Sequence, residues 1–103
     1  MTDSVKNAFV FGDRASPRIR TRLVVIGSST GGPQALQTVI TQLPSDFPCP
    51  VVVVQHMPAG FTGALAGRLH SVSQVNVREA RDGDVLEAGC VYIAPGNYHL
   101  RIL

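Results

Sequence analysis

Two unbroken apolar runs constrain the fold of this chain more than any other feature. Residues 23–26 form the first run, which ends at Gly27, and residues 51–54 form the second, which ends at Gln55 and His56. Short apolar runs that close on a glycine or a polar residue are typical of strands buried on both faces, as in a parallel sheet. With 103 residues, no Trp and few other aromatic residues, the chain makes at most one small domain with an aliphatic core.

Apolar residues at helical spacing follow each of these runs. The first set is Ala35, Leu36, Val39, Ile40 and Leu43, bounded by Pro33 and Pro44, and the second is Phe61, Leu65 and Leu69. Residues 75–77 predict a weaker strand and residues 91–94 a further one, closed by a turn at 95–97, with 98–103 as its hairpin partner. The alternation of strands and helices predicts βαβ units and therefore an α/β fold with a doubly wound, mostly parallel sheet.

The amino-terminal segment differs from the rest in charge and pattern. Residues 1–20 show no sustained hydrophobic period, and we expect a flexible basic arm or linker remnant there. Up to residue 22 there are five basic and two acidic residues, whereas the remainder has four basic and five acidic residues. The basic character therefore belongs to the arm, and no nucleic-acid partner is expected.

Several other classes of protein are not expected from the sequence. No apolar run is long enough for membrane insertion or for a signal peptide, so we expect a cytoplasmic protein. Cys49 and Cys90 lie far apart and form no metal-binding spacing with the three histidines, so no metal site is predicted.

The loop after the first predicted strand carries the chemistry. It reads Gly27-Ser28-Ser29-Thr30-Gly31-Gly32-Pro33. The carboxyl ends of parallel strands meet at one edge of a sheet, so this loop and His56 are expected side by side. A serine before a helix has unpaired backbone N–H groups nearby that can hold an oxyanion, and a histidine can act as its base. The same pattern also fits an ordinary helix cap or an anion site, although it matches neither the dinucleotide fingerprint nor the P-loop.

Three separated motifs resemble the chemotaxis receptor methylesterase family. They are Val-Ile-Gly-Ser-Ser-Thr-Gly-Gly at 25–32, Gln-His-Met-Pro at 55–58 with Gly-Phe-Thr at 60–62, and Ile-Ala-Pro-Gly at 93–96 with His99. The resemblance covers about residues 22–103. It implies a doubly wound α/β serine hydrolase that uses no metal or organic cofactor. Its members hydrolyse γ-glutamyl methyl esters on the cytoplasmic helices of chemoreceptors, and many also deamidate receptor glutamines.

The resemblance also implies roles for individual residues. Ser29 would be the nucleophile, and His56 would be the general base. Support for the loop and the oxyanion would come from Thr30, Gly31 and Gly32, and candidates for the substrate side are Met57 and His99. Ser28 stands where the family usually has a small residue, and we interpret it as a packing residue.

The sequence departs from the family pattern in one respect. The Gly-Met-Gly-Asn-Asp-Gly segment that supplies the triad Asp is absent from these 103 residues, as is the receiver domain that commonly precedes the catalytic domain. We therefore expect residues 21–103 to be the amino-terminal part, about half, of a methylesterase-type catalytic domain, nearly inactive alone. Asp82 is an alternative partner for His56, although its turn sequence favours bonds to its own backbone.

Two other functions stay open at this point. One is a catalytically inactive interaction fragment that needs a second half-domain, and the other is an anion-binding α/β module. The expected partners under the enzyme hypothesis are chemoreceptor helices and a receiver domain or the missing half-domain.

Overall fold

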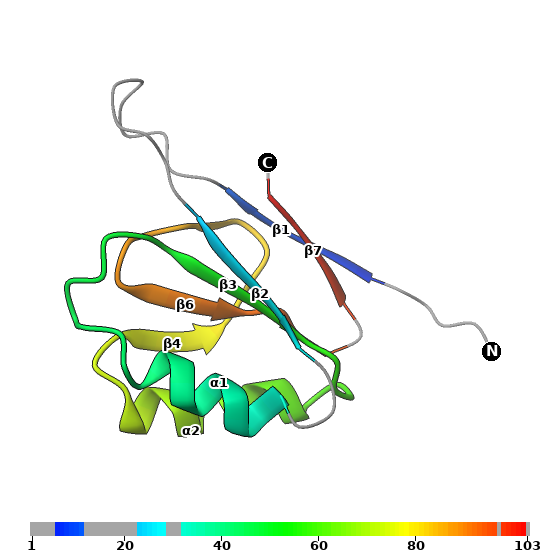
Figure 1. Cartoon of the computed structure of the whole chain (residues 1–103). Coiled ribbons are helices and arrows are strands. Elements are labelled where there is room, and N and C mark those ends of the chain that lie inside the picture. The colour runs from blue at the N-terminus through cyan, green and yellow to red at the C-terminus, as the bar shows by residue number, and fades with distance from the viewer. Residues whose placement is uncertain (1–5, 12–22, 29–31, 97, 103) are drawn as a thin grey trace.

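The computed structural model describes residues 6–11, 23–28, 32–96 and 98–102 (Figure 1). Its helices are α1 (Gly32–Ile40) and α2 (Phe61–Val72). Its strands are β1 (Lys6–Phe11), β2 (Val24–Ser28), β3 (Val51–Gln55), β4 (Asn76–Glu79), β5 (Asp84–Val85), β6 (Cys90–Ile93) and β7 (Tyr98–Ile102). Neither helix in this part of the chain is long and apolar enough to cross a bilayer.

The main sheet has the strand order β2-β3-β6-β4, and every neighbouring pair is parallel. Helix α1 connects β2 to β3, and α2 connects β3 to β4 past the position of β6. This arrangement confirms the predicted parallel α/β fold, including both apolar runs as β2 and β3. Pro33 lies in the first turn of α1, where its missing N–H removes no helical hydrogen bond.

Both described helices cover the same face of the main sheet (Figure 1). Because side chains alternate across a strand, Val51 and Val53 of β3 point to the helices, together with Val91 and Ile93 of β6. The helices contribute the buried side chains Leu36, Ile40, Leu65, Ala66 and Leu69 to this core.

The opposite face of the sheet is covered by the connection between β4 and β6 and by strand β7. Val52 and Tyr92 are buried there under Leu86, which belongs to the connection between β4 and β6, and Leu100 of β7 packs beside them. This cover does not reach β2, where Val25 is 61% exposed. The expectation that the first apolar run is buried on both faces is therefore wrong for β2, which lies at the edge of the sheet.

A second sheet has the order β5-β1-β7, with parallel pairing throughout. Strand β1 falls inside residues 1–20, for which no regular element was predicted. The hairpin predicted for residues 98–103 is also wrong, because β7 pairs with β1. The reason is that β6 already has β3 on one edge and β4 on the other, so no edge is free for a returning strand.

Candidate active site

Strands β2 and β3 end together at one edge of the main sheet. Their last residues, Ser28 and Gln55, are register partners, and the backbone N–H of His56 donates to the Ser28 carbonyl oxygen at 3.1 Å. The chain positions that follow these two ends are those of the predicted nucleophile and base. Ser29, Thr30 and Gly31 lie outside the described residues, so the contact between Ser29 and His56 stays a prediction.

The side chain of Ser28 has a polar partner. Its hydroxyl donates to Oε1 of Gln55, a residue that is 5% exposed. The hydroxyl of Ser28, which we interpret as a packing residue, is thus bonded to a buried amide. The bond ties the strand end before Ser29 to the strand end before His56.

The loop after β3 contains the predicted base. His56 is exposed, while Met57 is half-buried and packs against the core under α1 and α2. The loop ends at Gly60, whose φ of 92° lies in the left-handed region that favours glycine, and α2 begins at the next residue. An exposed imidazole on a short, well-anchored loop can reach a substrate without leaving the sheet edge.

Two further predicted site residues belong to described elements, Gly32 to α1 and His99 to β7. Gly32 is the first residue of α1, so the helix begins directly after the serine loop, as the oxyanion hypothesis requires. His99 lies in β7 opposite Asn7 of β1, and its side chain is outside the described part. Among the described residues no three His, Cys, Asp or Glu side chains come together as a metal site.

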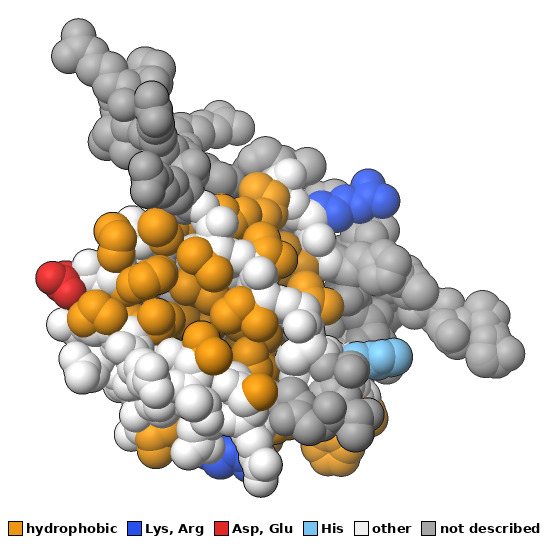
Figure 2. All heavy atoms as spheres, in the orientation of Figure 1, with side chains coloured by type: hydrophobic (Ala, Val, Ile, Leu, Met, Phe, Trp, Pro, Cys, Tyr) orange, Lys and Arg blue, Asp and Glu red, His pale blue; other side chains and the backbone are white. Residues whose placement is uncertain are grey.

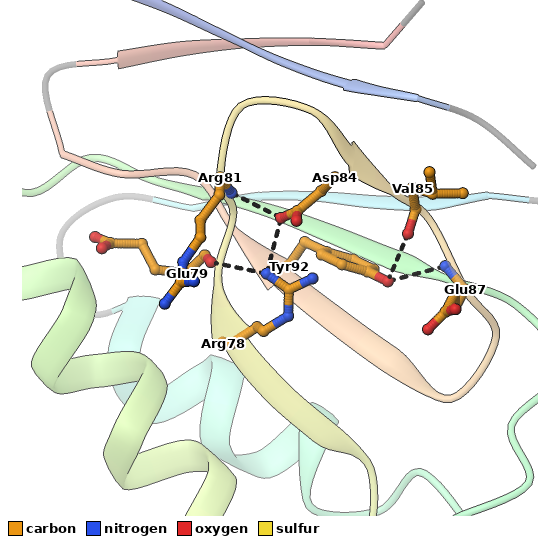
Figure 3. A network of polar contacts seen from close by, with 7 residues as sticks. All are labelled: Arg78, Glu79, Arg81, Asp84, Val85, Glu87 and Tyr92. Carbon is orange, nitrogen blue, oxygen red and sulfur yellow. Dashed lines mark hydrogen bonds and ion pairs between the residues drawn. The ribbon is translucent and has the colours of Figure 1, made fainter.

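The acidic turn between β4 and β5 has its own bonding pattern (Figure 3). Oδ2 of Asp84 accepts from the Arg81 backbone N–H at 2.7 Å, a local turn bond of the kind that we predict for Asp82. The same oxygen pairs with Arg78 Nη1 at 2.8 Å. Asp82 is exposed in this turn, and its proposed link to His56 stays a prediction.

These contacts shift the ionisation of both partners. Burial raises the pKa of the Asp84 carboxyl, but the bonds from Arg78 and the Arg81 backbone outweigh it, so the pKa lies below its ordinary value. The hydrogen bond to Asp84 raises the pKa of Arg78 despite the opposing effect of burial. The ion pair therefore persists at neutral pH and fixes the turn against β4.

Sequence reasoning missed a buried polar cluster behind the His56 loop. Thr62 is fully buried, donates to Glu79 Oε2 at 2.5 Å and accepts from the Gly96 backbone N–H at 2.9 Å. The motifs in the sequence contain two members of this cluster, the threonine of Gly-Phe-Thr and the glycine after Pro95, but nothing in the sequence indicates that they are in contact.

Comparison with known proteins connects this edge to one family. The sequence model of the CheB methylesterase family matches residues 24–103. A protein-glutamate methylesterase/protein-glutamine glutaminase of Halalkalibacterium halodurans is 58% identical over 78 residues, which cover 76% of this chain and 22% of that protein. The enzyme of that name from Thermotoga maritima is 57% identical over 84 residues, with 82% of this chain and 24% of that protein covered.

A solved structure shows the same similarity. The crystal structure of the Thermotoga maritima CheB methylesterase catalytic domain superimposes with a TM-score of 0.73 at 58% identity. The match covers 76% of this chain and 41% of that domain. The chain thus spans less than half of the solved catalytic domain and about a quarter of the full-length relatives quoted above.

Proposed function

Since this chain belongs to the CheB methylesterase family, we propose that it is part of a serine hydrolase that demethylates γ-glutamyl methyl esters of chemoreceptors. The observation that supports this most is the paired end of β2 and β3, where Ser28 and Gln55 are register partners. Ser29 and His56 are the next residues in the chain, so the proposed nucleophile and base each follow one of two neighbouring strand ends.

The proposed reaction needs two steps at this edge. Ser29 Oγ attacks the ester carbonyl carbon while His56 takes the hydroxyl proton, and the oxyanion is held by N–H groups before α1. His56 then gives the proton to the departing methoxide, and methanol leaves an acyl-enzyme. Water attacks that ester with His56 again as base, which releases the glutamate carboxylate and regenerates Ser29.

The same acyl-enzyme explains a second substrate. A receptor glutamine would lose ammonia instead of methanol in the first step, so deamidation needs no further group. Thr30, Gly31 and Gly32 would support the loop and the oxyanion, and Met57 and His99 would face the substrate. The proposed partners are the cytoplasmic helices of chemoreceptors together with a receiver domain or the remaining half-domain, which implies a cytoplasmic location.

A pair of adjacent serine substitutions tests the proposal. Residues 24–103 replace the matching part of the Thermotoga maritima catalytic domain, and methanol release from methylated receptor is measured. We expect Ser29→Ala to lower the rate by at least about 10³-fold, as loss of a nucleophile does in serine hydrolases. Ser28→Ala is the matched control, and we expect it to keep most of the activity because its hydroxyl points to Gln55.

The opposite result would reverse the assignment. If Ser28→Ala abolishes methanol release and Ser29→Ala preserves it, Ser29 is not the nucleophile. Labelling with a serine-reactive phosphonate gives a second readout, because the label should be lost with Ser29→Ala alone.

A further inference from the structure

The loop that carries His56 is held from behind by contacts between elements that are distant in sequence. On one side, the His56 N–H donates to the Ser28 carbonyl oxygen. At its other end, the Phe61 N–H donates to the Pro58 carbonyl oxygen at 3.2 Å, where α2 begins. These backbone bonds fix the two ends of the loop. The position of its middle depends on contacts with other segments of the chain.

Gly96 is the neighbour that lies against the middle of the loop. A Cβ at this position would lie 2.5 Å from the Pro58 carbonyl oxygen and 2.7 Å from the Ala59 nitrogen. Real Cβ atoms do not approach backbone this closely, so only glycine allows the contact. The chain after β6 therefore packs directly on the peptide bond between Pro58 and Ala59.

Thr62 holds Gly96 in that place. Its hydroxyl accepts the Gly96 N–H at 2.9 Å and donates its own proton to Glu79, so both functions of one buried hydroxyl are used. The side chain has no exposed surface. Loss of the hydroxyl would leave the Gly96 N–H buried without this acceptor, which is more costly than losing an exposed bond.

Glu79 completes the cluster at the end of β4. Its carboxylate lies beside the first turn of α2, with Oε1 3.7 Å from the position of a Cβ on Gly63. The first turn of α2 has no acidic residue, and Gly60 gives it no side-chain cap. Glu79 thus supplies from another element the negative charge that a helix amino terminus favours.

We propose that Thr62, with Glu79 and Gly96, positions the His56 loop at the sheet edge. The Thr62 hydroxyl is taken up by Glu79 and the Gly96 N–H, and the proposed reaction gives it no step, so Thr62 is a positioning residue. The cluster joins the ends of β4 and β6 and the start of α2 to the loop after β3, and His56 projects from that loop. The inference rests on the proposed function for the role of His56, but the geometry of the loop can be measured without turnover.

The test compares Thr62→Val with Thr62→Ser in the 103-residue chain. Valine keeps the shape and removes the hydroxyl, whereas serine keeps the hydroxyl. We expect Thr62→Val to speed amide exchange of Gly96 and Phe61 by about three- to tenfold and to shift the NMR signals of the His56 imidazole. Thr62→Ser should return both readouts to near the wild-type values.

Two internal controls separate positioning from general loosening. Thr38→Val removes an exposed threonine hydroxyl that bonds to Gln34 on α1, and it should leave His56 unchanged. His70 is also on α2, and its Nδ1 accepts the Val77 N–H at 3.0 Å, so its signals report the integrity of the helix. We expect His70 to keep its signals in Thr62→Val, and His56→Gln identifies the His56 signals.

Three results would overturn the proposal: unchanged His56 signals in Thr62→Val, equal changes at His56 and His70, or no recovery with Thr62→Ser. If Thr62→Val does not fold, Gly96→Ala decides, because the added methyl group displaces the loop directly. His56 must then shift while His70 does not. Failure of the Ser29 experiment would leave these readouts intact, so the two proposals fail separately.

Discussion

The hydroxyl of Tyr92 is held between two backbone groups of the segment that connects β4 to β6 (Figure 3). It accepts the Glu87 N–H at 2.9 Å and donates to the Val85 carbonyl oxygen at 3.3 Å. The ring is buried, and Arg78 lies over it at 5.1 Å from the centroid. One side chain of the core thereby fixes the position of an otherwise irregular connection.

Tyr92 should titrate far above the usual range for tyrosine. Burial raises the pKa of its hydroxyl to about 12. Because the folded-state pKa is raised, the stability linked to Tyr92 is complete below its unfolded pKa of about 10 and is lost as the pH rises through about 12. The ultraviolet absorbance of tyrosinate measures this titration.

The control for this prediction is Tyr92→Phe. It should remove the high-pH component of the absorbance titration and cost about 1 kcal/mol at neutral pH through the lost hydroxyl bonds. A normal titration midpoint for Tyr92 in the folded chain would contradict the burial argument.

At the scale of elements, the turn before β5 depends on the ion pair of Arg78 and Asp84. The pKa of Asp84 is lowered in the folded chain, so its contribution to stability is present above the unfolded pKa and is lost as the pH falls through the lower folded value. We expect Asp84→Asn to destabilise the chain at neutral pH by less than about 1 kcal/mol, since the pair is partly exposed.

Urea unfolding at several pH values checks this prediction. The difference between Asp84→Asn and wild type should shrink below about pH 4 as the wild-type carboxyl becomes protonated. Glu87→Gln neutralises an exposed carboxylate in the same connection, and its difference in stability from wild type at neutral pH should be smaller. A difference for Asp84→Asn that grows in acid would contradict the sign of the shift.

Most elements of the main sheet were predictable because their signals are local. The apolar runs and the helical spacing predicted β2, α1, β3 and α2, and these were confirmed. Strand pairing was harder to predict from the sequence. The hairpin predicted for β7 would need a free edge of β6, but β3 and β4 occupy both edges. β1 gave no periodic signal at all, and its partners lie far along the chain in β5 and β7.

In the candidate site, too, the local features were predictable from the sequence and the long-range contacts were not. The motifs place Ser29 and His56 after β2 and β3 without any knowledge of contacts. The cluster around Thr62 was not predictable, because its bonds span 17 residues to Glu79 and 34 to Gly96. No short pattern encodes such pairs, and a buried threonine looks like any other helix residue in the sequence.

At the scale of the whole molecule, apolar side chains gather on the side of the domain that carries β2 (Figure 2). Val25 is 61% exposed and Val54 is 44% exposed on neighbouring strands. Within the described part of the chain, the outer edge of β2 has no neighbouring strand. An exposed apolar strand at a sheet edge favours association with another chain.

We therefore expect the 103-residue chain to self-associate, and Val25→Lys to reduce this association. A charge on the edge strand opposes pairing between sheets. Val72→Lys is the matched control, because Val72 is 50% exposed at the end of α2 and receives the same charge. Sedimentation velocity over a range of concentrations measures both variants.

Two results would contradict this prediction. One is a wild-type chain that stays monomeric at every concentration, and the other is an equal effect of the two lysine substitutions. Either would mean that the β2 edge is not the surface that associates.

The strand order of the main sheet has a consequence for synthesis on the ribosome. β6 lies between β3 and β4 but follows both in the sequence. Translation from the end of β4 at Glu79 to the start of β6 at Cys90 takes about 0.5–2 s. During that interval the nascent sheet has a vacant central position flanked by two strands with unpaired backbone. The chain is then most exposed to chaperones and to misassembly, and insertion of β6 is the event that ends this vulnerable period.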